Sequence, residues 1–332
     1  MTGHKTISLL ALLVVSILVT GGCQSLEERT SKITPLKLSL AIQAVPHSGL
    51  IAIADDKGFF KESGLEVSIK AYPSGLSALE AVCRGEAQMA TTADIAFVGK
   101  TNEEPSLRIV ASIGLSTGNK IVARKDRNIL KPSDLKGKRV GFSPNTTCDY
   151  FLDMFLLANT IPRSEVNAVS IPPGRQVEAV VSGEVDAVSA FDVYAYEAEK
   201  RLGGNGVGWA AQNYLGYHWL LAVKESLTRS PEPIKRFLRA LVKAEKFLLS
   251  HEDEAKSIVT RNLGLDPGFV QQVWDKTTIN VTLNQSLLTS LDNFAGWKMN
   301  KEGKPRNLPN YLNYIYAGAL DEVDHKADTI FR

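Results

Sequence analysis

Residues 36–72 read LKLSLAIQAVPHSGLIAIADDKGFFKESGLEVSIKAY and contain two strand-like segments separated by a helical one. The run at 36–42 has the short, apolar character of a buried strand, and Pro46 interrupts it. Apolar residues at 50–57 then recur at helical spacing, and 65–71 form a second apolar run. Parallel strands need a crossover connection, which is usually a helix. This order therefore predicts a strand–helix–strand unit of an α/β sheet with helices on both faces.

The alternation of strands and helices continues in two series. The first series is expected to add helices at 77–84 and from Ile95, and strands at 88–91 and 107–113. The second series, after Arg124, is expected to contain strands at 139–142, 166–171 and 187–190 and helices at 146–158 and 176–182.

The remainder of the chain has a different character. The glycine-rich segment 203–208 lacks the spacing of a dinucleotide-binding motif and is expected to be a surface loop. A strand is expected at 219–223, and the chain from Pro231 onward is expected to be mostly helical. One apolar helical stripe consists of Ile234, Phe237, Leu238, Leu241, Ala244 and Leu248.

The composition is that of an ordinary globular protein. The 332 residues include 38 Lys and Arg and 36 Asp and Glu, a net charge of +2, and 44% are hydrophobic. The near balance of charge argues against a nucleic-acid-binding protein, and the apolar content argues against disorder. At about 100–200 residues per domain the length predicts two domains, and the cleft between two domains is a common ligand site.

Residues 1–22 have the features of a secretory signal peptide. Lys5 precedes an apolar run at 7–19. This run is shorter than the roughly 20 residues needed to span a bilayer. We therefore expect an exported protein whose mature chain has no transmembrane helix.

The signal peptide ends in Thr20-Gly21-Gly22-Cys23, which resembles the bacterial lipobox. Thr20 departs from the motif, which usually has Leu there. The resemblance implies that Cys23 is lipidated and anchors the protein at a bacterial membrane, on the periplasmic side or at the cell surface. Residues 23–35 are polar and would then be a tether. The alternative is an ordinary signal peptide that leaves Cys23 as a free thiol.

Four short motifs carry a resemblance to a known family. They are IADDKGFFKESGLEV (53–67), SDLKGKRVG (133–141), GEVDA (183–187) and AFDVY (190–194). Together they resemble the nitrate/sulfonate/taurine-type substrate-binding proteins of ABC importers, a family that also includes binders of thiamine-pyrimidine precursors. Val193 departs from the family, which commonly has proline there.

The resemblance implies a type II periplasmic-binding-protein fold, in which the chain crosses between two α/β lobes twice. Each lobe is expected to be a mostly parallel sheet flanked by helices. Lobe one is expected at 36–123 and 220–332, and lobe two with the hinge at 124–219. The crossings are expected near Ala123 and Arg124 and near 217–219. Cys83 and Cys148 fall in different lobes, so we expect both to be free thiols.

Ligands in open α/β sheets bind beyond the carboxyl ends of the strands, so the loops after the strands supply candidate ligand-binding residues. In lobe one these are His47, Ser48, Tyr72, Ser74, Gly75, Thr91 and Thr92, with Trp219 at the hinge. In lobe two they are Asn145, Thr146, Thr147, Arg175, Phe191 and Asp192.

Two of these groups have a specific expected role. Arg175 is the only arginine in a predicted cleft loop, and it either pairs with an acidic group of the ligand or is a solvated surface residue. Thr146 and Thr147 begin a helix, where free N–H groups attract anions, and the alternative role is capping of that helix. Asp192 either accepts a hydrogen bond from the ligand or shapes its own loop.

The supply of aromatic residues near the cleft favours an organic ligand over nitrate. These residues are Tyr72, Phe191, Tyr194, Tyr217 and Trp219. No nucleophile, metal or nucleotide motif occurs, so we expect no enzyme activity, no cofactor and no metal site. We expect a monomer that delivers a small molecule to an ABC permease. A partner of a sensory receptor and a biosynthetic enzyme on the same fold are the alternatives.

Overall fold

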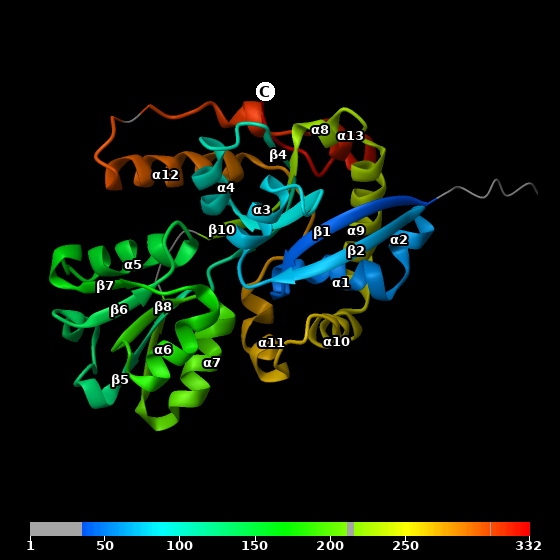
Figure 1. The fold of residues 1–332 in the computed structure, drawn as a ribbon. Helices are drawn as coiled ribbons and strands as arrows, with labels where there is room; N and C mark the ends of the chain where they lie inside the picture. The colour runs from blue at the N-terminus through cyan, green and yellow to red at the C-terminus, as the bar shows by residue number, and fades with distance from the viewer. Residues whose placement is uncertain (1–34, 211–215, 306) are drawn as a thin grey trace, which may run out of the picture. The chain divides into compact units, whose positions relative to one another are not determined.

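The computed structural model describes residues 35–210, 216–305 and 307–332, whose strands form two sheets (Figure 1). The first sheet has the order β2-β1-β3-β10-β4. β10 runs antiparallel to β3 and β4, whereas β1, β2 and β3 pair in parallel. The predicted mostly parallel sheet is therefore confirmed. Its strands are β1 (Leu36–Gln43), β2 (Leu65–Tyr72), β3 (Met89–Ala93), β4 (Leu107–Ser116) and β10 (Tyr217–Lys224).

Two groups of helices pack with the first sheet: α9 contacts α1 and α13, and α4 contacts α3 and α12. The predicted helical character after Pro231 is confirmed, and five residues of the apolar stripe, Ile234, Phe237, Leu238, Leu241 and Ala244, are buried in α9. The helices are α1 (Gly49–Asp56), α2 (Phe59–Glu62), α3 (Gly75–Cys83), α4 (Asp94–Thr101), α8 (Glu225–Thr228), α9 (Glu232–Ser250), α10 (Glu252–Asn262), α11 (Pro267–Val273), α12 (Gln285–Lys301) and α13 (Gly318–Asp324).

The second sheet repeats this design with the order β7-β6-β8-β5-β9. β5 is its antiparallel strand. Side chains alternate across β5, so that Ile121 and Ala123 enter one apolar cluster and Val122 enters another. The elements are β5 (Lys120–Arg124), β6 (Arg139–Phe142), β7 (Asn167–Ser170), β8 (Ala187–Ala190), β9 (Gly206–Ala210), α5 (Thr147–Ala158), α6 (Gln176–Ser182) and α7 (Asp192–Leu202).

The expected surface loop at 203–208 is wrong in its second half, because Gly206–Ala210 is the edge strand β9. The glycines favoured a loop in the sequence, but Gly208 lies where a side chain of α7 packs against the strand. A Cβ on Gly208 would collide with the Glu199 carboxylate of α7, which accepts a hydrogen bond from Lys120 of β5 at 2.9 Å. A side chain at position 208 would therefore make the flexible end of Glu199 move from its place beside Lys120.

The chain passes from the first sheet to the second between β4 and β5, and returns between β9 and β10. Ala123 and Arg124 lie inside β5, and residues 217–219 lie inside β10. The change of sheet therefore falls a few residues before each expected crossing. Cys83 in α3 and Cys148 in α5 are both free, as predicted.

Within the part of the chain that the structure describes, no helix combines the length and apolar character needed to cross a bilayer.

Candidate functional site

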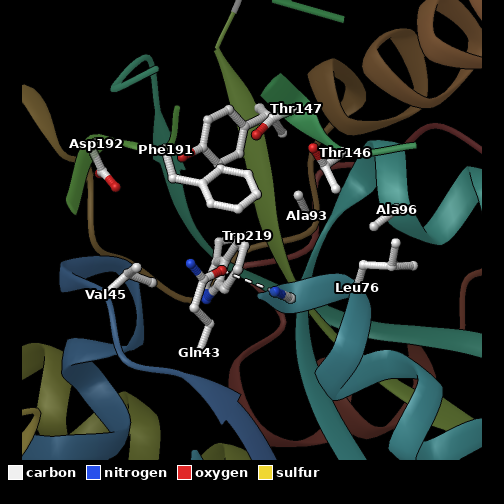
Figure 2. Close-up of a pocket in the computed structure, with 12 residues that line it drawn as sticks. Gln43, Val45, Leu76, Ala93, Ala96, Thr146, Thr147, Phe191, Asp192 and Trp219 are labelled. Atoms are coloured by element: carbon white, nitrogen blue, oxygen red, sulfur yellow. Dashed lines mark hydrogen bonds between the residues drawn. The ribbon is translucent and has the colours of Figure 1, made fainter. Parts of the chain in front are cut away.

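A pocket with an empty volume of about 360 Å³, part of it open to solvent, lies where the loops of the two sheets meet (Figure 2). Its walls come from the ends of β1 and β3, the residue after β8, the first turns of α3, α4, α5 and α7, and the start of β10. This is the position at the carboxyl ends of parallel strands where ligands bind in open α/β sheets. The lining residues are Gln43, Val45, Gly75, Leu76, Ala93, Ala96, Thr146, Thr147, Phe191, Asp192, Tyr217 and Trp219.

Gln43 ties β1 to the start of α3. Its backbone N–H donates to Thr91 Oγ1 at 3.2 Å, and its side-chain Oε1 accepts from the Gly75 N–H at 2.9 Å. Ser74 and Ser77 form a capping box on the same helix. The N–H groups of Gly75 and Ser77 at the start of α3 are therefore already bonded within the protein.

Trp219 forms an aromatic wall of the pocket. Its Nε1–H donates to Ser48 Oγ at 3.1 Å, so the polar atom of the indole is satisfied. The His47 ring lies behind this wall, 5.6 Å from Trp219 and 5.8 Å from Tyr217 between ring centroids. Both ring nitrogens of His47 are buried and have no hydrogen-bond partner in the part of the chain that the structure describes, and burial lowers the pKa of His47 to about 3. His47 is therefore neutral at physiological pH.

Thr146 and Thr147 line the other side of the pocket at the start of α5. Thr146 Oγ1 donates to the Ser143 carbonyl at 2.7 Å and accepts from the Cys148 N–H at 3.2 Å, which confirms the capping role. Asp149 in the first turn is buried and forms an ion pair with Lys301. The Asp149 carboxylate thus lies at the positive end of the α5 dipole and partly neutralises it.

Asp192 is the charged residue of the pocket wall. It is 5% exposed, and its Oδ1 accepts from the Val193 N–H at 2.8 Å. Its Oδ2 has no hydrogen-bond partner among the described residues. Burial raises the pKa of Asp192 to about 6, and the charge of Lys120 opposes this shift. Gly118 lies directly against it, since a Cβ there would be 2.7 Å from the Asp192 Cβ.

The predicted site residues fall into three groups. The structure brings one group together as pocket lining: Gly75, Thr146, Thr147, Phe191, Asp192 and Trp219. A second group is buried behind the lining: His47, Ser48, Ser74, Thr91 and Thr92. The third group lies away from it: Tyr72, Asn145 and Arg175.

Arg175 does not reach the pocket. Its side chain is 62% exposed and its guanidinium pairs with Glu184 at 2.8 Å. Asn145 is exposed, with φ of 58°, and its N–H donates to Asp149 Oδ2 at 3.2 Å. The Tyr72 hydroxyl lies 3.4 Å from Glu86 at the end of β2. The side chains of Arg175 and Tyr72 thus have partners outside the pocket lining, and Asn145 is bonded to Asp149 through its backbone N–H.

Some pocket residues were not predicted from the sequence. They are Gln43, Val45, Leu76, Ala93 and Ala96. Gln43 is the only polar member of this group, and its position directly after the first apolar run was a signal that could have indicated it. The apolar members carry no chemical signal in the sequence.

Contacts on either side of the pocket join elements that pack with different sheets. Asp153 of α5 accepts from Trp297 Nε1 of α12 at 3.0 Å and lies 3.4 Å from Lys301 Nζ. Asp266 accepts from the Tyr196 hydroxyl of α7 at 3.0 Å. Among the residues that the structure describes, no cluster of His, Cys, Asp or Glu could hold a metal ion.

The comparisons with known proteins agree with this architecture. A family model described as NMT1/THI5 like matches residues 45–255. The chain belongs to the NMT1/THI5-like family. The resemblance inferred from the four motifs is therefore confirmed at the level of family and fold.

The relatives of this NMT1/THI5-like protein have different names. A Haemophilus influenzae protein, provisionally named for thiamine biosynthesis, is 28% identical over 63% of this chain and 68% of its own length. The taurine-binding periplasmic protein of Escherichia coli is 25% identical over 66% of this chain and 68% of its own length. The alkanesulfonate-binding protein SsuA from Xanthomonas axonopodis pv. citri, solved bound to MOPS, has a TM-score of 0.72 at 17% identity and covers 86% of this chain and 99% of its own. The predicted two-lobe fold is therefore confirmed.

Proposed function

We propose that this protein is an exported solute-binding protein that captures a small organic molecule in the pocket and delivers it to an ABC permease. The observation that carries the proposal is that the pocket wall is drawn from both sheets, with Gln43 and Trp219 on one side and Thr147 and Phe191 on the other. The periplasmic binding roles in the names of two similar proteins support it.

Capture would use the two connections between the sheets as a hinge. Lobe one consists of the first sheet with its helices, and lobe two of the second sheet with its helices. A ligand that contacts both lobes binds the closed form more tightly, so it shifts the population toward closure. The permease then recognises the closed surface. The protein acts as a monomer, held at the membrane by the lipid on Cys23, which lies outside the described residues.

The function requires no chemical step. The Cys148 thiol does not line the pocket, and burial raises its pKa well above the ordinary range, so it is a poor nucleophile. The relative named for thiamine biosynthesis makes an enzyme the alternative that needs testing. A sensory role would differ from transport only in the partner protein that binds the closed form, which would be a receptor and not a permease.

The test is to purify the protein under native conditions, denature it and identify the released small molecules by mass spectrometry. The refolded protein is then incubated with the identified compound. Recovery of the compound unchanged, with a smaller radius of gyration by X-ray scattering than in its absence, is the expected result. A converted product would support the enzyme alternative, and no released or bound molecule would overturn the proposal.

A further inference from the structure

We infer that the pocket selects a ring-bearing ligand with a protonated nitrogen, such as an ammonium or amidinium group, which is held by Asp192. The pocket is correspondingly unsuited to a ligand whose only charged group is a sulfonate or another anion. This inference rests on the proposed solute-binding function and assigns the chemical class of its ligand.

The first observation is the unpartnered oxygen of Asp192. Buried polar atoms in proteins nearly always have a hydrogen-bond partner, and an unpaired one costs free energy. Asp192 Oδ1 accepts from the Val193 N–H, but Oδ2 has no partner among the residues that the structure describes, although Asp192 is only 5% exposed. Figure 2 shows the carboxyl at the edge of the pocket, beside Phe191. A donor on the ligand would satisfy it.

The second observation is the charge of the wall. No Lys, Arg or His is among the lining residues that the structure describes. Lys120 is the cation whose charge reaches Asp192, and its ammonium is paired with Glu199 at 2.9 Å. Arg175 is exposed and paired with Glu184. An anion in the pocket would therefore lie near a carboxylate without a free cation to balance it.

At the starts of α3 and α5, part of the N–H groups that could attract an anion are already bonded within the protein. The Gly75 N–H at the start of α3 is bonded to Gln43. At the start of α5, Thr146 accepts from the Cys148 N–H, and Asp149 occupies the first turn. The Gly75 and Cys148 N–H groups are thus already bonded, and the carboxylates of Asp149 and Asp192 in the first turns of α5 and α7 oppose an anion bound at those helix starts.

The third observation is the aromatic lining. Phe191 comes from lobe two, and Tyr217 and Trp219 come from β10 of lobe one. Aromatic faces stack on planar rings and attract cations, and both effects are stronger where water is excluded. A ring that carries a cationic nitrogen therefore matches the walls and the carboxylate together.

A protonated Asp192 could instead donate to an anion, and pH separates the two cases. The charge of Lys120 acts on Asp192, and Cys148 and Tyr217 lie near it with pKa values that burial raises well above their ordinary ranges, so these two stay neutral. Asp94, between the lining residues Ala93 and Ala96, also titrates in this range because burial raises its pKa to about 7, so a pH effect is assigned to Asp192 only if Asp192→Asn removes it. Burial raises the pKa of Asp192 itself to about 6. Affinity for a cation should fall as the pH drops through that value, whereas affinity for an anion should rise.

The experiment uses three probes that share one ring: benzylamine, benzyl alcohol and phenylmethanesulfonate. Binding to the full mature protein, freed of co-purified solutes, is measured by calorimetry at pH 7.5 and pH 5. We expect benzylamine to bind most tightly and phenylmethanesulfonate most weakly at pH 7.5. We expect Asp192→Asn to weaken benzylamine binding by about 10- to 100-fold, as for loss of a charge-assisted bond. Asp275→Asn, at an exposed position, is the matched control and should change nothing.

A preference for phenylmethanesulfonate, equal binding of the three probes, or no binding of benzylamine would overturn the inference. The proposed function would still stand if a solute is released from the native protein, so the two failures are distinguishable. Asn keeps an acceptor for the Val193 N–H, and thermal unfolding checks that the variant folds. If Asp192→Asn does not fold, the order of the three probes on the natural protein decides the question.

Discussion

The indole of Trp219 occupies the space in front of Gly75: a Cβ on Gly75 would lie 2.7 Å from Cη2 of Trp219 and 3.0 Å from the Thr92 Cα. One of these neighbours is a large ring and the other is backbone, so neither can move freely. The absence of a side chain at Gly75 therefore lets α3 approach β10 and sets the width of the pocket at this point.

Gly75→Ala should destabilise the protein, although alanine is the better helix former. Overpacking against rigid neighbours typically costs about 1–3 kcal/mol, which exceeds the gain in helix propensity of about 1 kcal/mol. The free energy of unfolding in urea measures the effect. Gly174→Ala is the control, because a Cβ there meets nothing within 4 Å. Equal stability of the two variants would contradict this packing argument.

Asp192→Asn should stabilise the ligand-free protein at neutral pH while it impairs binding. Burial raises the pKa of Asp192 in the folded protein from its ordinary value of 3.8 to about 6, so the natural protein loses stability as the pH rises from about 4 through 6. The variant lacks this loss and should be more stable above pH 7 by about 1–3 kcal/mol. Below pH 4 the difference should disappear. Urea unfolding of both proteins across this range measures it, and a difference independent of pH would exclude Asp192 titration as its cause.

Phe191→Ala should weaken binding of the co-purified solute by about 10- to 100-fold, because it removes an aromatic wall. Arg175→Ala should leave binding unchanged, since the exposed Arg175 side chain pairs with Glu184. Calorimetry with the identified solute gives both values. A larger loss for Arg175→Ala than for Phe191→Ala would restore the ion pair with the ligand that the sequence alone suggested.

Lys301→Met should favour an open form of the ligand-free protein. Lys301 of α12 pairs with both Asp149 and Asp153 of α5, and without it the two carboxylates lose a shared cation. We expect a larger radius of gyration by X-ray scattering and a weaker apparent affinity. Lys304→Met is the control, because Lys304 pairs with Glu302 of its own segment. Identical scattering of Lys301→Met and the natural protein would show that this pair does not hold the lobes together.

Cys23→Ser should release the protein into the soluble fraction, since the lipid would have no attachment site. Cell fractionation and metabolic labelling with a fatty acid test this. Cys83→Ser, at a half-buried free thiol, is the matched control and should stay with the membrane. If Cys23→Ser also stays there, the lipid anchor is wrong.

Much of the fold could be predicted because apolar periodicity reports directly on burial. The run at 36–42 corresponds to β1, and the stripe from Ile234 to Ala244 is buried in α9. β9 could not be predicted in this way. The Glu199 side chain of α7 fills the space where a Cβ on Gly208 would lie, and this contact forms only in the folded chain. Tertiary requirements of this kind leave no periodic pattern.

The sequence could predict which chain segments surround the pocket, but it could not predict which side chains in those segments point into it. Strand ends indicated the right loops, yet Thr91 lies inside β3, where its hydroxyl accepts from Gln43. Successive strand residues face opposite sides, so an error of one or two residues at a strand end changes which side chains enter the pocket. The direction of a long side chain such as Arg175 depends on a partner, Glu184, that only the folded chain brings near.

The strands of the second sheet lie in the sequence between β4 and β10 of the first sheet. This arrangement also determines the order in which a newly made chain can complete its two sheets. Among the strands that the structure describes, β4 pairs with β10 alone, and residues 117–216 lie between them in the sequence. All strands of the second sheet lie between Lys120 and Ala210, so the ribosome delivers that sheet in full while β3 and β4 still lack the strand that joins them. The lobe that begins later in the sequence can therefore finish folding earlier, and the first lobe depends on a long-range contact that forms slowly.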